Sequence, residues 1–222
     1  MTRMNHVQKA FIFFGLLLLT FCTSAQTHRF ENEIQAFETQ DKQSPPPVQP
    51  ILFVGSSSIR LWPDLQQYFP DKVVLNRGFG GSELSDVRYF ADRAIIAYNP
   101  KQIVLYAGEN DIASSKLTAQ QTYDNFVDLF QYVRQKLPGV PFVYIAIKHS
   151  PSRRQFWSVV NETNQRISQY LAKQTDAKFV DIRPSMLGPN NQPLGTLFKS
   201  DSLHMTDAGY QRWAPVLKPY LK

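Results

Sequence analysis

The sequence contains one cysteine, Cys22, in 222 residues. Cys22 lies in an N-terminal segment that we expect to be removed, so the mature chain has no cysteine and can form no disulfide bond. This excludes a disulfide-rich scaffold. Residues 26–222 are numerous enough for one domain to be stabilised by its hydrophobic core alone, and one main domain is therefore expected.

A strong excess of charge of one sign is also absent. The chain has 24 Lys and Arg and 18 Asp and Glu. Two of the basic residues, Arg3 and Lys9, precede the mature chain, which leaves 22 basic and 18 acidic side chains spread along it. A net charge of +4 without a basic cluster does not indicate a nucleic-acid-binding protein.

The most conspicuous long hydrophobic run is AFIFFGLLLLTF, and it is too short to indicate a membrane span. Basic residues precede the run and the small residues Thr23-Ser24-Ala25 follow it, an arrangement typical of a secretory signal peptide. We expect residues 1–25 to be this signal peptide, with cleavage after Ala25. The alternative, a lipoprotein anchored at Cys22, is disfavoured by the bulky Phe21. We therefore expect a secreted or periplasmic protein whose mature chain does not span the membrane.

Residues 26–50 combine a predicted amphipathic helix with the proline-rich stretch SPPPVQP, which ends that helix. From residue 51 to residue 222, apolar runs rich in Val, Ile and Tyr alternate with amphipathic stretches. The expected strands lie near 51–55, 72–76, 102–107, 141–147 and 178–182, and the expected helices near 58–68, 83–97, 118–137, 154–175 and 206–220. This alternation predicts an α/β fold, a three-layer α/β/α sandwich around a five-stranded parallel sheet.

Ligands of such sheets bind beyond the carboxyl ends of the strands, and the unusual residues of this chain follow strands. Three serines, residues 56–58, follow the first strand, and a serine there can act as a nucleophile if a base removes its proton. His204 is the best candidate for that base. Asp201 lies three residues earlier, which can place its carboxylate beside the Nδ1 atom of the imidazole and leave Nε2 free to face a serine.

Donors for a negatively charged oxygen are expected at the same edge of the sheet. Gly81 follows the second strand, where an unobstructed backbone N–H can point into the cleft. Asn110 follows the third strand and offers a neutral amide. The backbone N–H of the nucleophile itself, at the start of a helix, would be the third donor. Together these groups predict an oxyanion hole.

Four segments in order, FVGSSSIRLW, NRGFGGSELSD, YAGENDI and DSLHMTDAGY, resemble the four blocks of the SGNH hydrolases, also called GDSL esterases and lipases. The resemblance implies the flavodoxin-like SGNH hydrolase fold, Ser57 as the nucleophile, and an oxyanion hole formed by Ser57, Gly81 and Asn110. It further implies that Asp201 and His204 complete the triad. Ser56 stands where the family has the aspartate of GDSL, a difference that we interpret as the mark of a subfamily.

Each motif has a simpler interpretation. Serines after a strand are often helix caps, and glycines after a strand are often turn residues. The segment GFGGSE has Glu83 in place of the third glycine of a dinucleotide-binding loop. His149 is a competing base, but no carboxylate lies near it in sequence, and no spacing of His149 and His204 matches a metal site. The loop KHSPSRRQFW is either a solvated surface or a substrate contact through His149 and Arg153.

The sequence therefore predicts a serine esterase that cleaves short acyl esters, with acetyl favoured because no lid insertion is evident. The expected substrate is a small-molecule or carbohydrate ester, and no metal or organic cofactor is expected. The resemblance includes proteins similar to platelet-activating-factor acetylhydrolases and to carbohydrate esterases. Two alternatives share the motifs: an acyltransferase that uses a sugar hydroxyl as acceptor, and a carbohydrate-binding envelope protein without activity.

Overall fold

The computed structural model describes residues 28–222. The predicted signal peptide, its cleavage site and Cys22 lie outside the described residues. Within residues 28–222 no helix is long and apolar enough to cross a membrane.

Five strands form a single parallel sheet in the order β2-β1-β3-β4-β5. The strands are β1 (Ile51–Gly55), β2 (Val74–Gly78), β3 (Gln102–Tyr106), β4 (Phe142–Ile145) and β5 (Ala177–Val180). This is the strand order of flavodoxin-like folds, and the predicted α/β/α sandwich is confirmed. The order reverses between β1 and β3, so the crevice at this switch point lies between the segments that follow these two strands.

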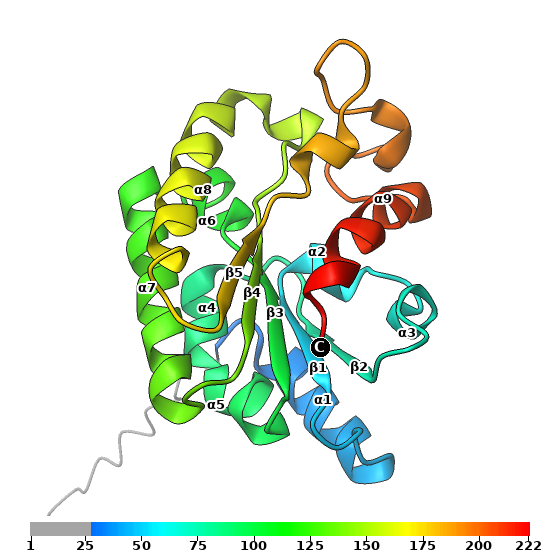
Figure 1. The fold of residues 1–222 in the computed structure, drawn as a ribbon, viewed down its shortest axis with the longest axis vertical. Helices are drawn as coiled ribbons and strands as arrows, with labels where there is room; N and C mark the ends of the chain where they lie inside the picture. Colours follow the sequence, from blue (N-terminus) through cyan, green and yellow to red (C-terminus); the bar gives the residue numbers. More distant parts are fainter. Residues whose placement is uncertain (1–27) are drawn as a thin grey trace, which may run out of the picture.

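Helices cover both faces of the sheet (Figure 1). In chain order, the α-helices of the described residues are α1 (Glu31–Gln43), α2 (Ser57–Arg60), α3 (Leu65–Tyr68), α4 (Leu84–Tyr89), α5 (Ala91–Ala94), α6 (Glu109–Ala113), α7 (Ala119–Lys136), α8 (Trp157–Leu171) and α9 (Asp207–Leu217). The 3₁₀ segments of the described residues are η1 (Ile96–Tyr98), η2 (Pro151–Phe156), η3 (Arg183–Met186), η4 (Gly195–Leu197) and η5 (Lys218–Tyr220).

The core is divided into two clusters by the sheet. On one face α1, α4, α7 and α8 pack against alternate strand residues such as Val54 and Leu105. On the other face α2, α3 and α9 pack against the intervening ones, such as Phe53 and Val104. All five residues of β1 and of β3 are buried, as expected for central strands covered on both faces.

Several predicted helices are shorter than expected or broken. The helix predicted over 58–68 is two short helices, because Pro63 disfavours a helical conformation at the preceding residue and Asp64 is left-handed. The stretch 83–97 is divided into α4, α5 and η1. The stretch 154–175 begins with η2 before α8, and the short helix α6 directly after β3 was not predicted. The helix predicted in residues 26–50 is α1.

Candidate active site

The chain turns sharply where β1 ends, and this turn places Ser57. Gly55 has a φ of +126°, and a side chain on it would lie 1.9 Å from the carbonyl oxygen of Tyr106 on β3. Glycine is therefore required here. The next residue, Ser56, donates its backbone N–H to that same carbonyl oxygen at 2.9 Å. Ser57 follows as the first residue of α2, half-buried at the carboxyl edge of the sheet.

The structure brings Ser57, His204 and Asp201 together although 147 residues separate Ser57 from His204. Nε2 of His204 lies 3.0 Å from Oγ of Ser57. Nδ1 of His204 lies 2.6 Å from Oδ2 of Asp201. The three side chains thus form a continuous hydrogen-bonded chain with the geometry of a nucleophile, a base and an orienting carboxylate.

The loop that carries Asp201 and His204 holds the carboxylate with backbone donors in addition to the imidazole. Oδ1 of Asp201 accepts the backbone N–H groups of Leu203 and His204, both at 2.9 Å. The hydrogen bond from His204, together with these backbone donors, lowers the pKa of Asp201 to about 2. An ionised carboxylate only accepts, so Nδ1 of His204 carries the proton and Nε2 is left to accept one from Ser57.

Two backbone N–H groups in the segments that follow β1 and β2 have no acceptor within the described residues. None of the hydrogen bonds within residues 28–222 uses the backbone N–H of Ser57 or of Gly81. Ser57 is at the first position of a helix, where N–H groups have no partner within the helix. Gly81 has a φ of +80°, and a side chain on it would project into open space, which agrees with an unobstructed approach to its N–H.

Asn110 lies in α6 and its amide is held at both ends. Its Nδ2 donates to the carbonyl oxygen of Ser82, beside Gly81, at 3.1 Å. Its Oδ1 accepts from Nη2 of Arg153 at 2.9 Å. The side chain is buried, with 7% of the residue exposed. One N–H of the amide is left after these contacts, because a primary amide has two.

Beneath these residues lies a buried ion pair that the sequence analysis missed. Nζ of Lys148 lies 2.5 Å from Oε2 of Glu109 and 3.2 Å from both Oγ of Ser58 and the hydroxyl of Tyr106. Ser58 lies in the first turn of α2, and its hydroxyl joins this network. Burial opposes ionisation of Glu109, but Lys148 and Arg153 outweigh it and hold its pKa below the usual value.

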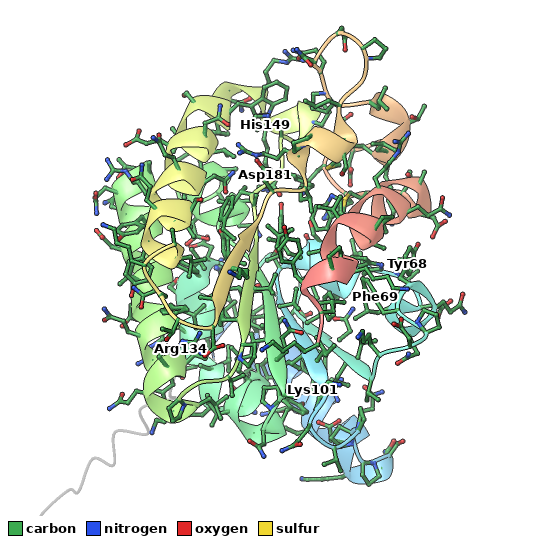
Figure 2. The ribbon with its side chains drawn as sticks, viewed as in Figure 1. Tyr68, Phe69, Lys101, Arg134, His149 and Asp181 are labelled. Carbon is green, nitrogen blue, oxygen red and sulfur yellow. The ribbon has the colours of Figure 1, made fainter. Side chains whose placement is uncertain are left out.

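The two residues predicted as substrate contacts lie in different surroundings. Arg153 reaches the site through Asn110. His149 instead contacts Asn161, with Nε2 2.9 Å from Oδ1, and stacks on Trp157 with ring centres 4.7 Å apart. Burial lowers the pKa of His149. Figure 2 shows His149 beyond the carboxyl end of the sheet, near Asp181.

The signal that could have revealed the ion pair was present in the sequence. Glu109 and Lys148 each follow an apolar strand by a few residues, and parallel strands end at the same edge of the sheet. What was missing is that β3 and β4 are neighbours, which only the strand order shows.

Within residues 28–222, no group of three or more His, Cys, Asp or Glu side chains could hold a metal ion.

The family model described as the GDSL-like Lipase/Acylhydrolase family matches residues 54–212, well over half of the chain. The chain belongs to this family. The predicted resemblance is therefore confirmed, and so is the predicted enzyme class, because membership of the GDSL-like family makes the protein a carboxylic ester hydrolase. A search of curated proteins finds no match.

Three solved structures illustrate the shared fold. A candidate platelet activating factor from Streptococcus pneumonia is 22% identical with a TM-score of 0.75, over 86% of this chain and 92% of that one. A GDSL-like lipase from Bacteroides thetaiotaomicron is 20% identical with a TM-score of 0.69, over 84% and 95%. A mutant of the acetyl-xylooligosaccharide esterase Axe2 from Geobacillus Stearmophilus is 14% identical with a TM-score of 0.62, over 78% and 94%. At these identities the likeness shows the fold.

Proposed function

We propose that the protein is a serine esterase in which Ser57 is the nucleophile, His204 the general base and Asp201 the residue that orients His204. The observation that carries this proposal is the chain of two hydrogen bonds from Asp201 through His204 to Ser57, at 2.6 and 3.0 Å. A serine hydroxyl becomes an effective nucleophile only when such a base is in place.

In the proposed reaction, Nε2 of His204 takes the proton of Ser57 as Oγ attacks the ester carbonyl carbon. The carbonyl oxygen becomes negative and is stabilised by the backbone N–H groups of Ser57 and Gly81 and by the remaining N–H of Asn110. His204 then gives its proton to the departing alcohol. Water, deprotonated by His204, attacks the acyl-enzyme and releases the acid and Ser57.

The proposed substrate is an ester of a short acyl group, with acetyl favoured, on a small molecule or carbohydrate. Exposure of the triad supports this choice, because 46% of the Asp201 side chain and 27% of the His204 side chain face solvent. An exposed site accommodates a bulky, polar alcohol part more readily than it shields a long acyl chain. The similarity in fold to an acetyl-xylooligosaccharide esterase agrees with this proposal.

The test is hydrolysis of nitrophenyl acetate, butyrate and octanoate by residues 26–222, with Ser57→Ala in parallel. We expect acetate to be cleaved fastest and Ser57→Ala to lose at least about 1000-fold in kcat, because no hydroxyl remains to form the acyl-enzyme. Circular dichroism of the variant checks its folding. Full activity in a folded Ser57→Ala protein would show that Ser57 is not the nucleophile, and a preference for octanoate would exclude the short-acyl proposal.

We also propose that the protein is exported and that its leader is removed after Ala25. The basic start, the apolar run at residues 10–21 and the small residues before Gln26 support this proposal. The mass of the protein recovered from the medium or periplasm is the measurement. A chain that begins at Gln26 is expected, and a lipid-modified chain that begins at Cys22 would replace secretion with anchoring.

A further inference from the structure

The guanidinium of Arg153 lies between two acceptors that belong to the protein itself, Asn110 and Glu109. Nη2 donates to Oδ1 of Asn110 at 2.9 Å, and Nη1 lies 3.6 Å from Oε1 of Glu109. Only 17% of the side chain is exposed. A guanidinium engaged in this way on both sides has little freedom to turn toward a ligand.

The contact with Arg153 decides which end of the Asn110 amide faces the oxyanion. An amide can rotate by half a turn about its last side-chain bond at little steric cost, which exchanges its oxygen and nitrogen. If Asn110 rotated in this way, its NH₂ group would face the Arg153 donor and its oxygen would face the Ser82 carbonyl. Both hydrogen bonds would be lost and replaced by repulsive contacts, so the amide stays with its nitrogen toward Ser82.

A fixed amide matters because the rotated form would oppose catalysis. With its oxygen toward the reacting carbonyl, Asn110 would repel the negative charge that the other donors stabilise. A positive charge on Arg153 also polarises the amide to which it is bonded, and so strengthens the N–H that remains. The contribution of an oxyanion donor depends on its being oriented before the reaction begins.

The segment that carries Arg153 is itself anchored to the catalytic loop and to the sheet. The backbone N–H and the hydroxyl of Ser152 donate to the carbonyl oxygen of Ser202, at 3.1 and 3.0 Å, between Asp201 and His204. Ser150 donates to Glu109. The amide of Asn164 on α8 bonds both the N–H and the carbonyl of Ile147, each at 2.9 Å. Arg153 is therefore held from a rigid base.

We infer that Arg153 is a positioning residue of the oxyanion hole: its guanidinium fixes the Asn110 amide with an N–H toward the reacting carbonyl oxygen. This inference rests on the proposed function and assigns a role to a residue that the sequence analysis had placed among substrate contacts. Arg153 acts through Asn110 and touches neither substrate nor the reacting atoms.

The experiment is a double-mutant cycle of Arg153→Ala and Asn110→Ala with nitrophenyl acetate, a small neutral substrate. Arg153→Ala should lower kcat by about 10- to 100-fold with KM within about twofold of wild type, because the lost interaction belongs to the transition state. In the Asn110→Ala background the same substitution should have almost no further effect, because the residue through which Arg153 acts is gone.

Arg153→Lys and Arg154→Ala are the matched comparisons. Lysine keeps the positive charge and N–H donors on a single nitrogen, but not the planar fork of the guanidinium, so it should recover part of the lost kcat. Arg154 is exposed and lies over the Trp157 ring, so its loss should leave kcat and KM unchanged. Thermal unfolding of every variant separates a loss of fold from a loss of orientation, and Arg153→Lys keeps the test informative if Arg153→Ala unfolds.

Three results would overturn the inference. The first is a raised KM with unchanged kcat for Arg153→Ala, and the second is a kcat for Arg153→Ala equal to that of wild type. The third is a double variant whose loss in kcat equals the product of the losses of Arg153→Ala and Asn110→Ala. Failure of the proposed function looks different, because Ser57→Ala would then remain active. The rate at which a fluorophosphonate labels Ser57 gives a second measurement, because its phosphoryl oxygen occupies the same hole. Arg153→Ala should slow this labelling, and an unchanged rate would contradict the inference.

Discussion

In the proposed triad, the side chain of Asp201 orients His204 from a position close to the surface. Its two oxygens have separate tasks: Oδ1 accepts two backbone N–H groups of its own loop, and Oδ2 accepts the imidazole. Ser202, which lies between Asp201 and His204 in the sequence, adopts a left-handed conformation with a φ of +54°, which few residues other than glycine favour. The tight turn is therefore built around the carboxylate, and the carboxylate sets the tautomer of His204.

Asp201→Asn should lower kcat/KM of nitrophenyl acetate hydrolysis by about 10- to 1000-fold, less than the loss for Ser57→Ala. The amide can keep the backbone contacts, but it favours the wrong tautomer of His204. Because 27% of the His204 side chain is exposed, water is expected to replace part of the lost interaction, which limits the effect. Steady-state kinetics at pH 8 make the measurement. An Asp201→Asn protein as active as wild type would remove Asp201 from the proposed triad.

Helix α1 lies outside residues 54–212, which the family model matches, yet it is bonded to the sheet. Arg77 at the end of β2 pairs with Asp41 of α1, and the Tyr98 hydroxyl donates to the same carboxylate at 2.6 Å. The Arg77 side chain is only 5% exposed. Near the start of α1, Glu33 accepts the backbone N–H of Gly80, next to Gly81, at 3.1 Å. The helix therefore supports the loop of the proposed oxyanion hole.

Asp41→Ala should lower the free energy of unfolding by about 3 kcal/mol, because it leaves the buried Arg77 charge without its partner. Asp128→Ala is the control. It removes an exposed carboxylate paired with Arg88, and a change of less than about 1 kcal/mol is expected. Urea denaturation of both variants makes the comparison. Equal effects of the two substitutions would show that the Arg77 pair does not anchor α1.

The stability of the whole molecule is coupled to pH through the buried carboxyl group of Asp111. Asp111 has no exposed surface, and burial raises its pKa to about 7 in spite of the Leu84 N–H that it accepts. The folded protein thus binds this proton more tightly than the unfolded chain, where the pKa is near 3.8. Between these two values stability must fall as pH rises, because ionisation favours the unfolded state.

Asp111→Asn removes that ionisation and keeps an oxygen for Leu84. Relative to wild type, the variant should gain stability as pH rises from 4 to 7, by up to about 4 kcal/mol in the free energy of unfolding. Below pH 4 the gain should be absent. Urea denaturation across this range measures the difference, with Asp124→Asn on the exposed surface of α7 as the control for loss of a carboxylate. A difference that does not change with pH would contradict burial of an ionisable Asp111.

The sequence alone determined the layered α/β fold and the identity of the candidate catalytic residues. The fold follows from hydrophobic runs of strand length, and the pairing of Asp201 with His204 follows from their close spacing in sequence. Ser57 is one of three consecutive serines, and the resemblance of four segments to the blocks of the SGNH hydrolases implies that it is the nucleophile. Because parallel strands end at one edge of the sheet, the order of the motifs was enough to expect Ser57, Gly81 and Asn110 to lie close together.

Only the tertiary structure decided what holds these residues in place. The pairing of Glu109 with Lys148, the contact of Arg153 with Asn110 and the support of the Gly80 loop by Glu33 join positions that are about 40 residues or more apart in sequence. Such contacts depend on which strands are neighbours and which side chains are buried together. Burial also decides their strength, because a charge removed from water must find a partner within the protein.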